Sequence, residues 1–232
     1  MTYVMSDIHG QYEKYLTMLE KIACSDDDTL YVLGDVIDRG PQPTELLTDM
    51  SMRANVIPIL GNHEVMASVL LRRLCVEVTE ENAETQITAE LLQSIYAWRE
   101  DGGDTTLAGF RRLPPEDREA LLDYLDDFLP YEITEVGGNR FVLVHGGIPY
   151  EDRRTPLSEQ PLMTLVEHRP DYLMRYWDHA YLVTGHTPTL HIGDAYIGRI
   201  YRDHGHIAVD CGAGFGMPLG CIRLDDFHEF YV

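Results

Sequence analysis

The chain has 232 residues, of which 44% are hydrophobic and 25% are charged. These proportions are typical of globular proteins and exclude a disordered, collagen-like or low-complexity chain. With 18 basic and 39 acidic residues, the formal net charge is −21, which repels polyanions and argues against a nucleic-acid partner. An acidic protein can still bind a phosphate group where divalent ions supply the positive charge.

The cysteines and the hydropathy pattern indicate the cellular setting. The four cysteines are far apart and form no Cys-x-x-Cys pair, so we expect reduced thiols instead of a disulfide framework. Residues 1–7 lack the basic and apolar segments of a secretory signal. No run approaches the roughly 18 apolar residues that a membrane helix needs. The sequence therefore predicts a soluble, cytoplasmic protein that does not bind membranes.

In chain order, short apolar runs alternate with helical patterns. Runs that end abruptly in Gly, Asp, Asn or His predict five buried strands, at residues 3–5, 30–33, 56–60, 141–144 and 181–184. Helical spacing of apolar residues predicts helices over residues 12–23 and 44–53. The alternation indicates an α/β sheet, and ligands bind such sheets at the carboxyl ends of the strands. We therefore expect the five polar clusters to share one site.

Residues 64–130 lack strand signals. Apolar residues at helical spacing over residues 91–98 and 121–128 predict amphipathic helices, and hence a helical insertion over about residues 65–130. Beyond Gly193, short alternating runs predict antiparallel strands that close the fold, at residues 195–201, 206–210, 220–224 and 227–232. We expect His204 and Gly205 to form a hairpin turn.

The turns after the five strands carry a mixed set of carboxylate, amide and imidazole side chains. These are Asp7, His9, Asp35, Asn62, His145 and His186. Imidazole suits transition-metal ions and carboxylate oxygen suits harder ions, so the mixture favours Mn²⁺, with Fe or Zn as alternatives, over calcium. Asp35 is the candidate bridge between two ions because a carboxylate has two usable oxygens. A lone histidine is more often an ordinary polar residue, but chance does not explain five such clusters at strand ends.

Five motifs occur in a fixed order along the chain. They are Asp7-Ile8-His9, GDVIDRG at residues 34–40, GNHE at residues 61–64, His145-Gly146-Gly147 and GHTP at residues 185–188. Together they closely resemble the signature of the PPP metallophosphatases, a family of serine/threonine protein phosphatases and bacterial symmetrical diadenosine-tetraphosphatases. The resemblance implies a calcineurin-like metallophosphoesterase sandwich of two mixed sheets flanked by helices. It also implies a single domain over residues 1–232 that contains the helical insertion.

The resemblance further implies two divalent metal ions. It assigns Asp7, His9 and Asp35 to the first ion, and it assigns to the second ion the bridging Asp35 together with Asn62, His145 and His186. Two such ions hold phosphoryl oxygens and lower the pKa of a shared water, which attacks phosphorus in line.

The same resemblance assigns catalytic roles to residues beside the ligands. His63 acts as general acid toward the leaving group, and Asp38 orients its imidazole. Arg39 binds the phosphate through its planar guanidinium. A second phosphate-binding arginine is expected between the last two motifs. Arg169 best fits that pattern, although the usual tryptophan before it is absent, and Arg175 is the competing choice.

These features predict a phosphomonoesterase that removes phosphate from phosphoserine, phosphothreonine and small aryl phosphates. One alternative is a dinucleoside polyphosphate hydrolase, because its metal site is similar. Another is a catalytically silent phosphate-binding scaffold. Residues 98–107 resemble a segment shared by bacterial protein phosphatases and dinucleotide hydrolases, so they do not discriminate between the substrates. We expect Trp98 in that segment to be a core residue instead of a stacking partner for a base. The sequence identifies no partner protein.

Overall fold

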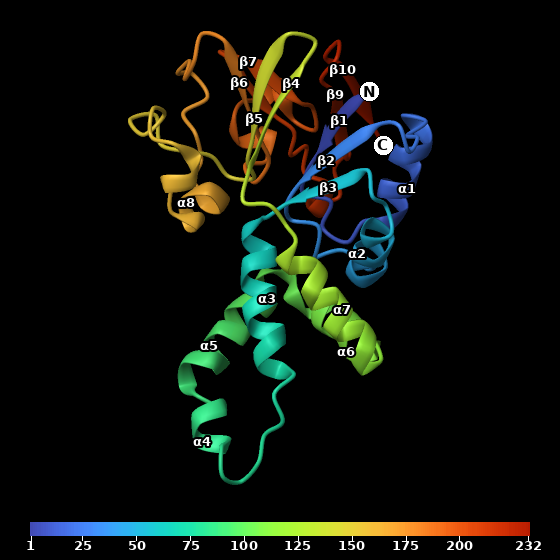
Figure 1. The fold of residues 1–232 in the computed structure, drawn as a ribbon, viewed down its shortest axis with the longest axis vertical. Coiled ribbons are helices and arrows are strands. Elements are labelled where there is room, and N and C mark those ends of the chain that lie inside the picture. Colours follow the sequence, from blue (N-terminus) through green and yellow to red (C-terminus); the bar gives the residue numbers. More distant parts are fainter.

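Ten strands form two five-stranded sheets in the computed structural model, which describes residues 1–232 (Figure 1). The first sheet has the order β10 (His228–Tyr231), β9 (Gly220–Arg223), β1 (Thr2–Met5), β2 (Thr29–Leu33), β3 (Val56–Ile59). The second has the order β4 (Glu132–Val136), β5 (Asn139–Leu143), β6 (Ala180–Thr184), β8 (His206–Ala208), β7 (Tyr201–Asp203). Both sheets mix parallel and antiparallel pairs, which confirms the predicted class of fold.

The alternation of side chains along the strands explains how the sheets pack. In β1, Val4 faces the other sheet, whereas Tyr3 and Met5 face the helices of the first sheet. In β5, Phe141 and Leu143 face the first sheet. Successive residues of a strand point to opposite faces, so each sheet buries one face against the other sheet.

Helices cover the outer faces of this sandwich. The helices α1 (Tyr12–Lys21) and α2 (Pro43–Ser51) lie on the first sheet, and α8 (Leu162–Glu167) lies beside the second (Figure 1). None of the helices of the protein combines the length and the apolar composition needed to cross a membrane.

Five further helices lie between β3 and β4 and project away from the sheets (Figure 1). They are α3 (Asn62–Leu74), α4 (Ala83–Gln86), α5 (Ala89–Trp98), α6 (Asp104–Arg112) and α7 (Pro115–Asp126). A π-helical turn at Arg99–Gly103 joins α5 to α6. Short 3₁₀ turns occur at Leu157–Glu159, Thr189–His191, Asp194–Tyr196 and Ala213–Phe215.

The last part of the chain corrects one prediction. Of the predicted strand at residues 195–201, only Tyr201 lies in a strand (β7), because a 3₁₀ turn occupies Asp194–Tyr196 and Gly198 has a φ of +67°, which interrupts an extended backbone. The predicted hairpin turn at His204 and Gly205 is present, and both residues have positive φ, as two-residue hairpin turns of type I′ require. The strand β8 pairs parallel with β6, so the closing strands are not all antiparallel as we expected.

Candidate metal centre

The predicted ligand residues come together where the carboxyl ends of strands from both sheets meet. Asp7 and His9 follow β1, Asp35 follows β2, and Asn62 begins α3 after β3. His145 and His186 follow β5 and β6 of the second sheet. Side chains that lie far apart in the sequence therefore surround one point at the seam of the sandwich.

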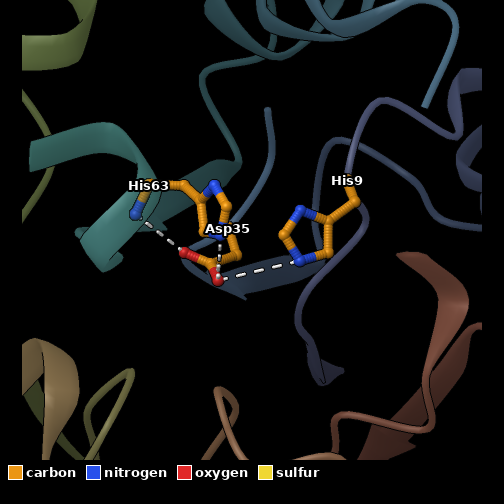
Figure 2. A group of neighbouring side chains, drawn as sticks. All are labelled: His9, Asp35 and His63. Atoms are coloured by element: carbon orange, nitrogen blue, oxygen red, sulfur yellow. Dashed lines mark hydrogen bonds and ion pairs between the residues drawn. The ribbon is translucent and has the colours of Figure 1, made fainter. Parts of the chain in front are cut away.

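The carboxylate of Asp35 lies at the centre of this cluster. Its Oδ2 lies 3.7 Å from Nε2 of His9 and 3.8 Å from Nε2 of His63, and both rings point toward it (Figure 2). Its Oδ1 lies 3.3 Å from Nε2 of His145. The two oxygens thus face different histidines, which is the arrangement that a bridging carboxylate requires.

Two overlapping groups of donor atoms share Asp35. One contains His9 and His63, the other contains His145 and His186, and within each group the donor atoms lie within 4.8 Å of one another. The amide oxygen of Asn62 lies 3.0 Å from Nε2 of His145 and 3.1 Å from Nδ1 of His186, so it belongs to the second group.

Backbone carbonyls set the orientation of two of these histidines. Nδ1 of His9 donates to the carbonyl of Ile37 at 2.9 Å, and Nδ1 of His145 donates to the carbonyl of Leu33 at 2.6 Å. Each Nε2 is then turned toward Asp35, the orientation in which it can bind a cation once it carries no proton. Such carbonyl contacts are typical of histidines that bind metals.

The charges in the cluster also fit bound cations. Asp7, Asp35, Glu64 and Asp210 are all at most 3% exposed. Burial raises the pKa of Asp7 to about 6, and burial together with Asp7 raises the pKa of Asp210. Several buried carboxyl groups in one place are costly unless positive charge accompanies them. The donor atoms and the charge therefore both fit divalent cations.

The histidines differ in protonation. Burial lowers the pKa of His9 to about 3, and burial together with His145 lowers the pKa of His186 to about 4, so both have the neutral form that binds metals. Although burial opposes it, Asp35 raises the pKa of His145 to about 10. A cation that binds His145 must therefore displace a proton.

Asp7 lies at the edge of the cluster. Its Oδ2 accepts hydrogen bonds from the backbone N–H of His186, at 3.0 Å, and from the hydroxyl of Ser6. The donor group that contains His9 and Asp35 includes His63 and not Asp7. The geometry thus leaves two ways to complete the first ligand set, with Asp7 as predicted or with His63.

His63 and Asp38 form a buried pair. Nδ1 of His63 lies 2.6 Å from Oδ2 of Asp38. Burial works against a charged imidazole, but the carboxylates of Asp35 and Asp38 outweigh it and raise the pKa of His63 to about 9. The imidazole is therefore protonated at neutral pH and has a proton that it can donate.

The helical segment around residues 98–106 holds Asp38 in place. Nε1 of Trp98 donates to Oδ2 of Asp38 at 2.8 Å, and Thr106 donates its hydroxyl to Oδ1. Trp98 is fully buried, which confirms the prediction of a core residue and excludes stacking on a base. Its hydrogen bond to Asp38 could not be predicted from local patterns, because the contact joins residues 60 positions apart.

Arg39 lies over the metal cluster. Its Nη1 lies 2.8 Å from Nε2 of His9, and its Nη2 lies 3.0 Å from Nε2 of His63. The same Nη2 donates to Asp101 at 2.9 Å, and the guanidinium packs on the ring of Phe215. Our sequence interpretation missed Asp101. The polar break at residues 101–104 between two helical patterns is the signal that could have found it.

A glycine allows the insertion to approach Arg39 this closely. The carbonyl of Gly102 accepts the backbone N–H of Arg39 at 2.9 Å. A Cβ atom on Gly102 would lie 2.5 Å from Cγ of Arg39, and its φ of +103° disfavours other residues. The position of the insertion therefore depends on this glycine.

The two candidates for the second arginine lie in different places. Residues 166–170 pack on Gly146 and Gly147, directly after His145, and Arg169 is close enough to lower the pKa of His186. Arg175 instead lies against Gly205, which precedes β8 and is at the opposite end of the sheet. Position thus favours Arg169 as the arginine that a substrate on the metal cluster could reach.

Glu64 is buried beneath the cluster and makes only backbone contacts. It accepts N–H groups of Asp35, Val36, Ile37 and Gly61 at 2.8 to 3.3 Å. It therefore ties the turn after β2 to the start of α3. Its role is therefore structural.

The backbone of the cluster is strained. Six of its residues have φ between +48° and +68° although they are not glycine, namely Asp7, His9, Asp35, Asp38, Arg39 and His186. This left-handed conformation costs about 1–3 kcal/mol per residue, and functional sites are where such strain is usually found.

The chain belongs to the calcineurin-like phosphoesterase family, because the model of that family matches residues 2–212. The fold and the five motifs are thus those of a calcineurin-like phosphoesterase domain. This confirms the relationship to the metallophosphatases that the five motifs predict.

Curated relatives and solved structures agree with this assignment. Two relatives are named symmetrical bis(5'-nucleosyl)-tetraphosphatase. The one from Paracidovorax citrulli is 28% identical over 63% of this chain and 44% of its own length. The one from Buchnera aphidicola is 41% identical over 28% of this chain and 24% of its own length. The matched part of the chain thus spans less than half of each relative.

Two crystal structures have the same fold. A candidate diadenosine tetraphosphatase superposes with a TM-score of 0.64 at 14% identity, over all of this chain and 92% of the other. A serine/threonine phosphatase from Saccharomyces cerevisiae gives 0.57 at 15% identity, over all of this chain and 78% of the other. At these identities the similarity concerns the fold alone.

Proposed function

We propose that this protein is a phosphomonoesterase that removes phosphate from phosphoserine, phosphothreonine and small aryl phosphates with the help of two divalent ions, Mn²⁺ first among them. One observation carries the proposal. The protonated His63, held by Asp38, faces Asp35, the carboxylate that the two donor groups share. A proton donor beside a binding site for cations is what cleavage of a phosphoester needs.

The residues that we expect to hold the ions are the six ligands predicted from the sequence, of which Asp7 lies outside both donor groups. Asp7, His9 and Asp35 are assigned to one ion, and Asp35, Asn62, His145 and His186 to the other. When bound, two such ions neutralise phosphoryl oxygens and activate a water for in-line attack on phosphorus. The chain fixes their ligands through carbonyl contacts to His9 and His145 before any ion binds.

His63 supplies the proton for the leaving oxygen. Its Nδ1 is engaged by Asp38, so Nε2 is the atom that would deliver a proton to a substrate, in place of its contact with Nη2 of Arg39 at 3.0 Å. Because the pKa of His63 is raised to about 9, the acid form is present throughout the neutral range. Asp38 keeps the ring in one orientation, and it is itself held by Trp98 and Thr106.

The positive charge beside the cluster suits a single phosphate group. Arg39 lies over the donor groups, and Arg169 lies beside His145 and His186. Asp101 already accepts one N–H of Arg39. Two arginines, one of them partly neutralised by Asp101, match the two negative charges of a phosphomonoester. A polyphosphate carries more negative charges, spread over a longer chain, and would need more positive groups.

A second candidate is hydrolysis of a dinucleoside tetraphosphate. The names of the two curated relatives favour it. Against it stands the short aligned length, which is less than half of each relative. The reaction at phosphorus would use the same residues, so the two candidates differ only in substrate.

A comparison of substrates tests the proposal. We would measure kcat/KM for a phosphoserine peptide, para-nitrophenyl phosphate and diadenosine tetraphosphate at one Mn²⁺ concentration. We expect the two monoesters to be hydrolysed well and the dinucleotide poorly. A preference for the dinucleotide by orders of magnitude would reverse the choice of substrate. Absence of turnover on all three would favour the silent scaffold.

A further inference from the structure

One cavity of the protein lies away from the candidate metal centre. It is a cleft of about 670 Å³, a size typical of sites for small molecules. Its walls are Arg140 and Val142 of β5, Ile133 of β4, Ala180 at the start of β6, and the loop residues Tyr150, 153–157 and 175–179. These loops cover the face of the second sheet that is turned away from the first (Figure 1).

The strand direction separates this cleft from the cluster around Asp35. Arg140 lies near the start of β5 and His145 follows its end, about 16 Å further along an extended chain. In the same way, Ala180 begins β6 and His186 follows it. The cleft and the metal centre therefore lie toward opposite ends of the second sheet.

The cleft gathers positive charge in an acidic protein. Four arginines line it, Arg140, Arg153, Arg154 and Arg175, together with His179, against a single carboxylate, Asp178. The ion pairs of arginine in this protein involve other residues, namely Arg39, Arg53, Arg72, Arg99 and Arg223. The guanidinium groups in the cleft thus have no carboxylate partner and are free to bind an anion.

Three of these arginines make neither an ion pair nor a hydrogen bond through their side chains. The side chains of Arg140, Arg154 and Arg175 form no hydrogen bond within the protein. Arg153 differs, because it donates to the carbonyl of Tyr150 at 2.8 Å and stacks on the Tyr150 ring. Arg153 shapes the wall, and the other three are available to a ligand.

An aromatic ring forms part of the same wall. Trp177 is half-buried in the cleft, and its Nε1 donates to the carbonyl of Arg153 at 2.9 Å. Tyr176 packs edge-on against it, with ring centroids 5.9 Å apart. A fixed ring next to arginines offers stacking for a base and fork-shaped donors for phosphate.

We propose that this cleft is a nucleotide-binding site, with the phosphates on Arg140, Arg154 and Arg175 and the base against Trp177. The site is separate from the phosphomonoesterase centre and does not depend on which ester that centre cleaves.

Tryptophan fluorescence provides the test, with ADP as the probe. The protein has two tryptophans, Trp98 buried beside Asp38 and Trp177 in the cleft, so a change on ligand binding that is lost in Trp177→Phe reports on the cleft. We expect ADP to change the fluorescence of the Mn²⁺-loaded protein saturably. Replacing both Arg140 and Arg154 with alanine should weaken this binding by about tenfold or more, the effect of losing charged hydrogen bonds.

Matched variants locate the binding. The double variant Arg111→Ala/Arg112→Ala removes two exposed arginines from α6 and should bind ADP like the wild type. Arg39→Ala should also keep ADP binding, because Arg39 belongs to the metal centre. The melting temperature of each variant checks that it is folded.

Four results would overturn the proposal. They are the absence of a saturable change with ADP, loss of binding in Arg39→Ala but not in Arg140→Ala/Arg154→Ala, a fluorescence change that persists in Trp177→Phe, and pyrophosphate binding as tightly as ADP. Turnover of para-nitrophenyl phosphate by the same wild-type sample is recorded separately. Failure of the proposed function would therefore be distinguishable from failure of the nucleotide site.

Discussion

The indole Nε1 of Trp98 donates a hydrogen bond to Oδ2 of Asp38 at 2.8 Å, although 60 residues separate them. The same carboxylate oxygen lies 2.6 Å from Nδ1 of His63. The helical insertion thus reaches the proposed general acid through a single shared atom. The orientation of His63 depends on residues outside the two sheets.

Replacing Trp98 with phenylalanine should lower kcat about tenfold with little change in KM. The ring still fills the core, but Asp38 loses a hydrogen bond to its charged group, worth about 1.5–3 kcal/mol, and holds His63 less firmly. Steady-state kinetics on para-nitrophenyl phosphate measures both parameters. Tyr96→Phe, an exposed aromatic change on the same helix, is the control and should have no effect. Equal kcat in Trp98→Phe and wild type would contradict the role of the indole.

The Asp38→Asn variant should shift the pH dependence of kcat. His63 has its pKa raised to about 9, so its acid form is present below that pH and is lost as the pH rises through it. Without the negative charge of Asp38 the pKa of His63 falls, and the decline in kcat on the alkaline side should begin at lower pH. A pH profile of kcat at saturating substrate measures the shift. An unchanged alkaline limb would mean that another group limits the rate.

Asp101→Asn should strengthen the binding of phosphate. Asp101 competes with the substrate for Nη2 of Arg39, and its charge repels a phosphate anion. An exposed ion pair of this kind is worth about 0.2–1 kcal/mol, so the inhibition constant of inorganic phosphate should fall by up to about fivefold. Asp104→Asn removes a carboxylate from the same segment, one that pairs with Arg99, and serves as the control. Weaker inhibition in Asp101→Asn would show that Asp101 helps to position Arg39.

Metal content distinguishes ligands from the general acid. Asp35→Asn removes the carboxylate shared by both donor groups, so it should lower both the amount of Mn²⁺ retained after dialysis and the turnover. His63→Ala should lower turnover steeply but retain the Mn²⁺ content of the wild type. A lower Mn²⁺ content in His63→Ala would mean that His63 completes the first ligand set. The 3.8 Å distance between Nε2 of His63 and Oδ2 of Asp35 allows this.

The sequence was informative where a functional residue directly follows a strand. Asp7, Asp35 and His145 each end an apolar run, and parallel strands bring such ends to the same edge. Period-two and helical patterns also located most of the elements. The gathering of the polar clusters could therefore be predicted from local signals alone.

Contacts between distant segments could not be predicted in this way. The bonds of Trp98 and Thr106 to Asp38, and of Asp101 to Arg39, depend on how the insertion folds back over the sheets. In residues 195–201 apolar and polar side chains alternate as in a strand, yet the positive φ of Gly198 interrupts the extended backbone there. A periodic pattern records which side chains prefer burial, but not whether a neighbouring strand is present to pair with.

The left-handed backbone at the metal cluster has a consequence for evolution and engineering. At Asp35, Arg39 and four neighbouring positions, glycine would relieve strain of about 1–3 kcal/mol each, but it would remove the side chain. Selection of this protein for heat resistance alone should therefore enrich glycine at these positions and yield hardier, inactive variants. A screen that selects only for stability at high temperature should therefore identify the residues of this centre as the positions at which glycine replaces the native side chain.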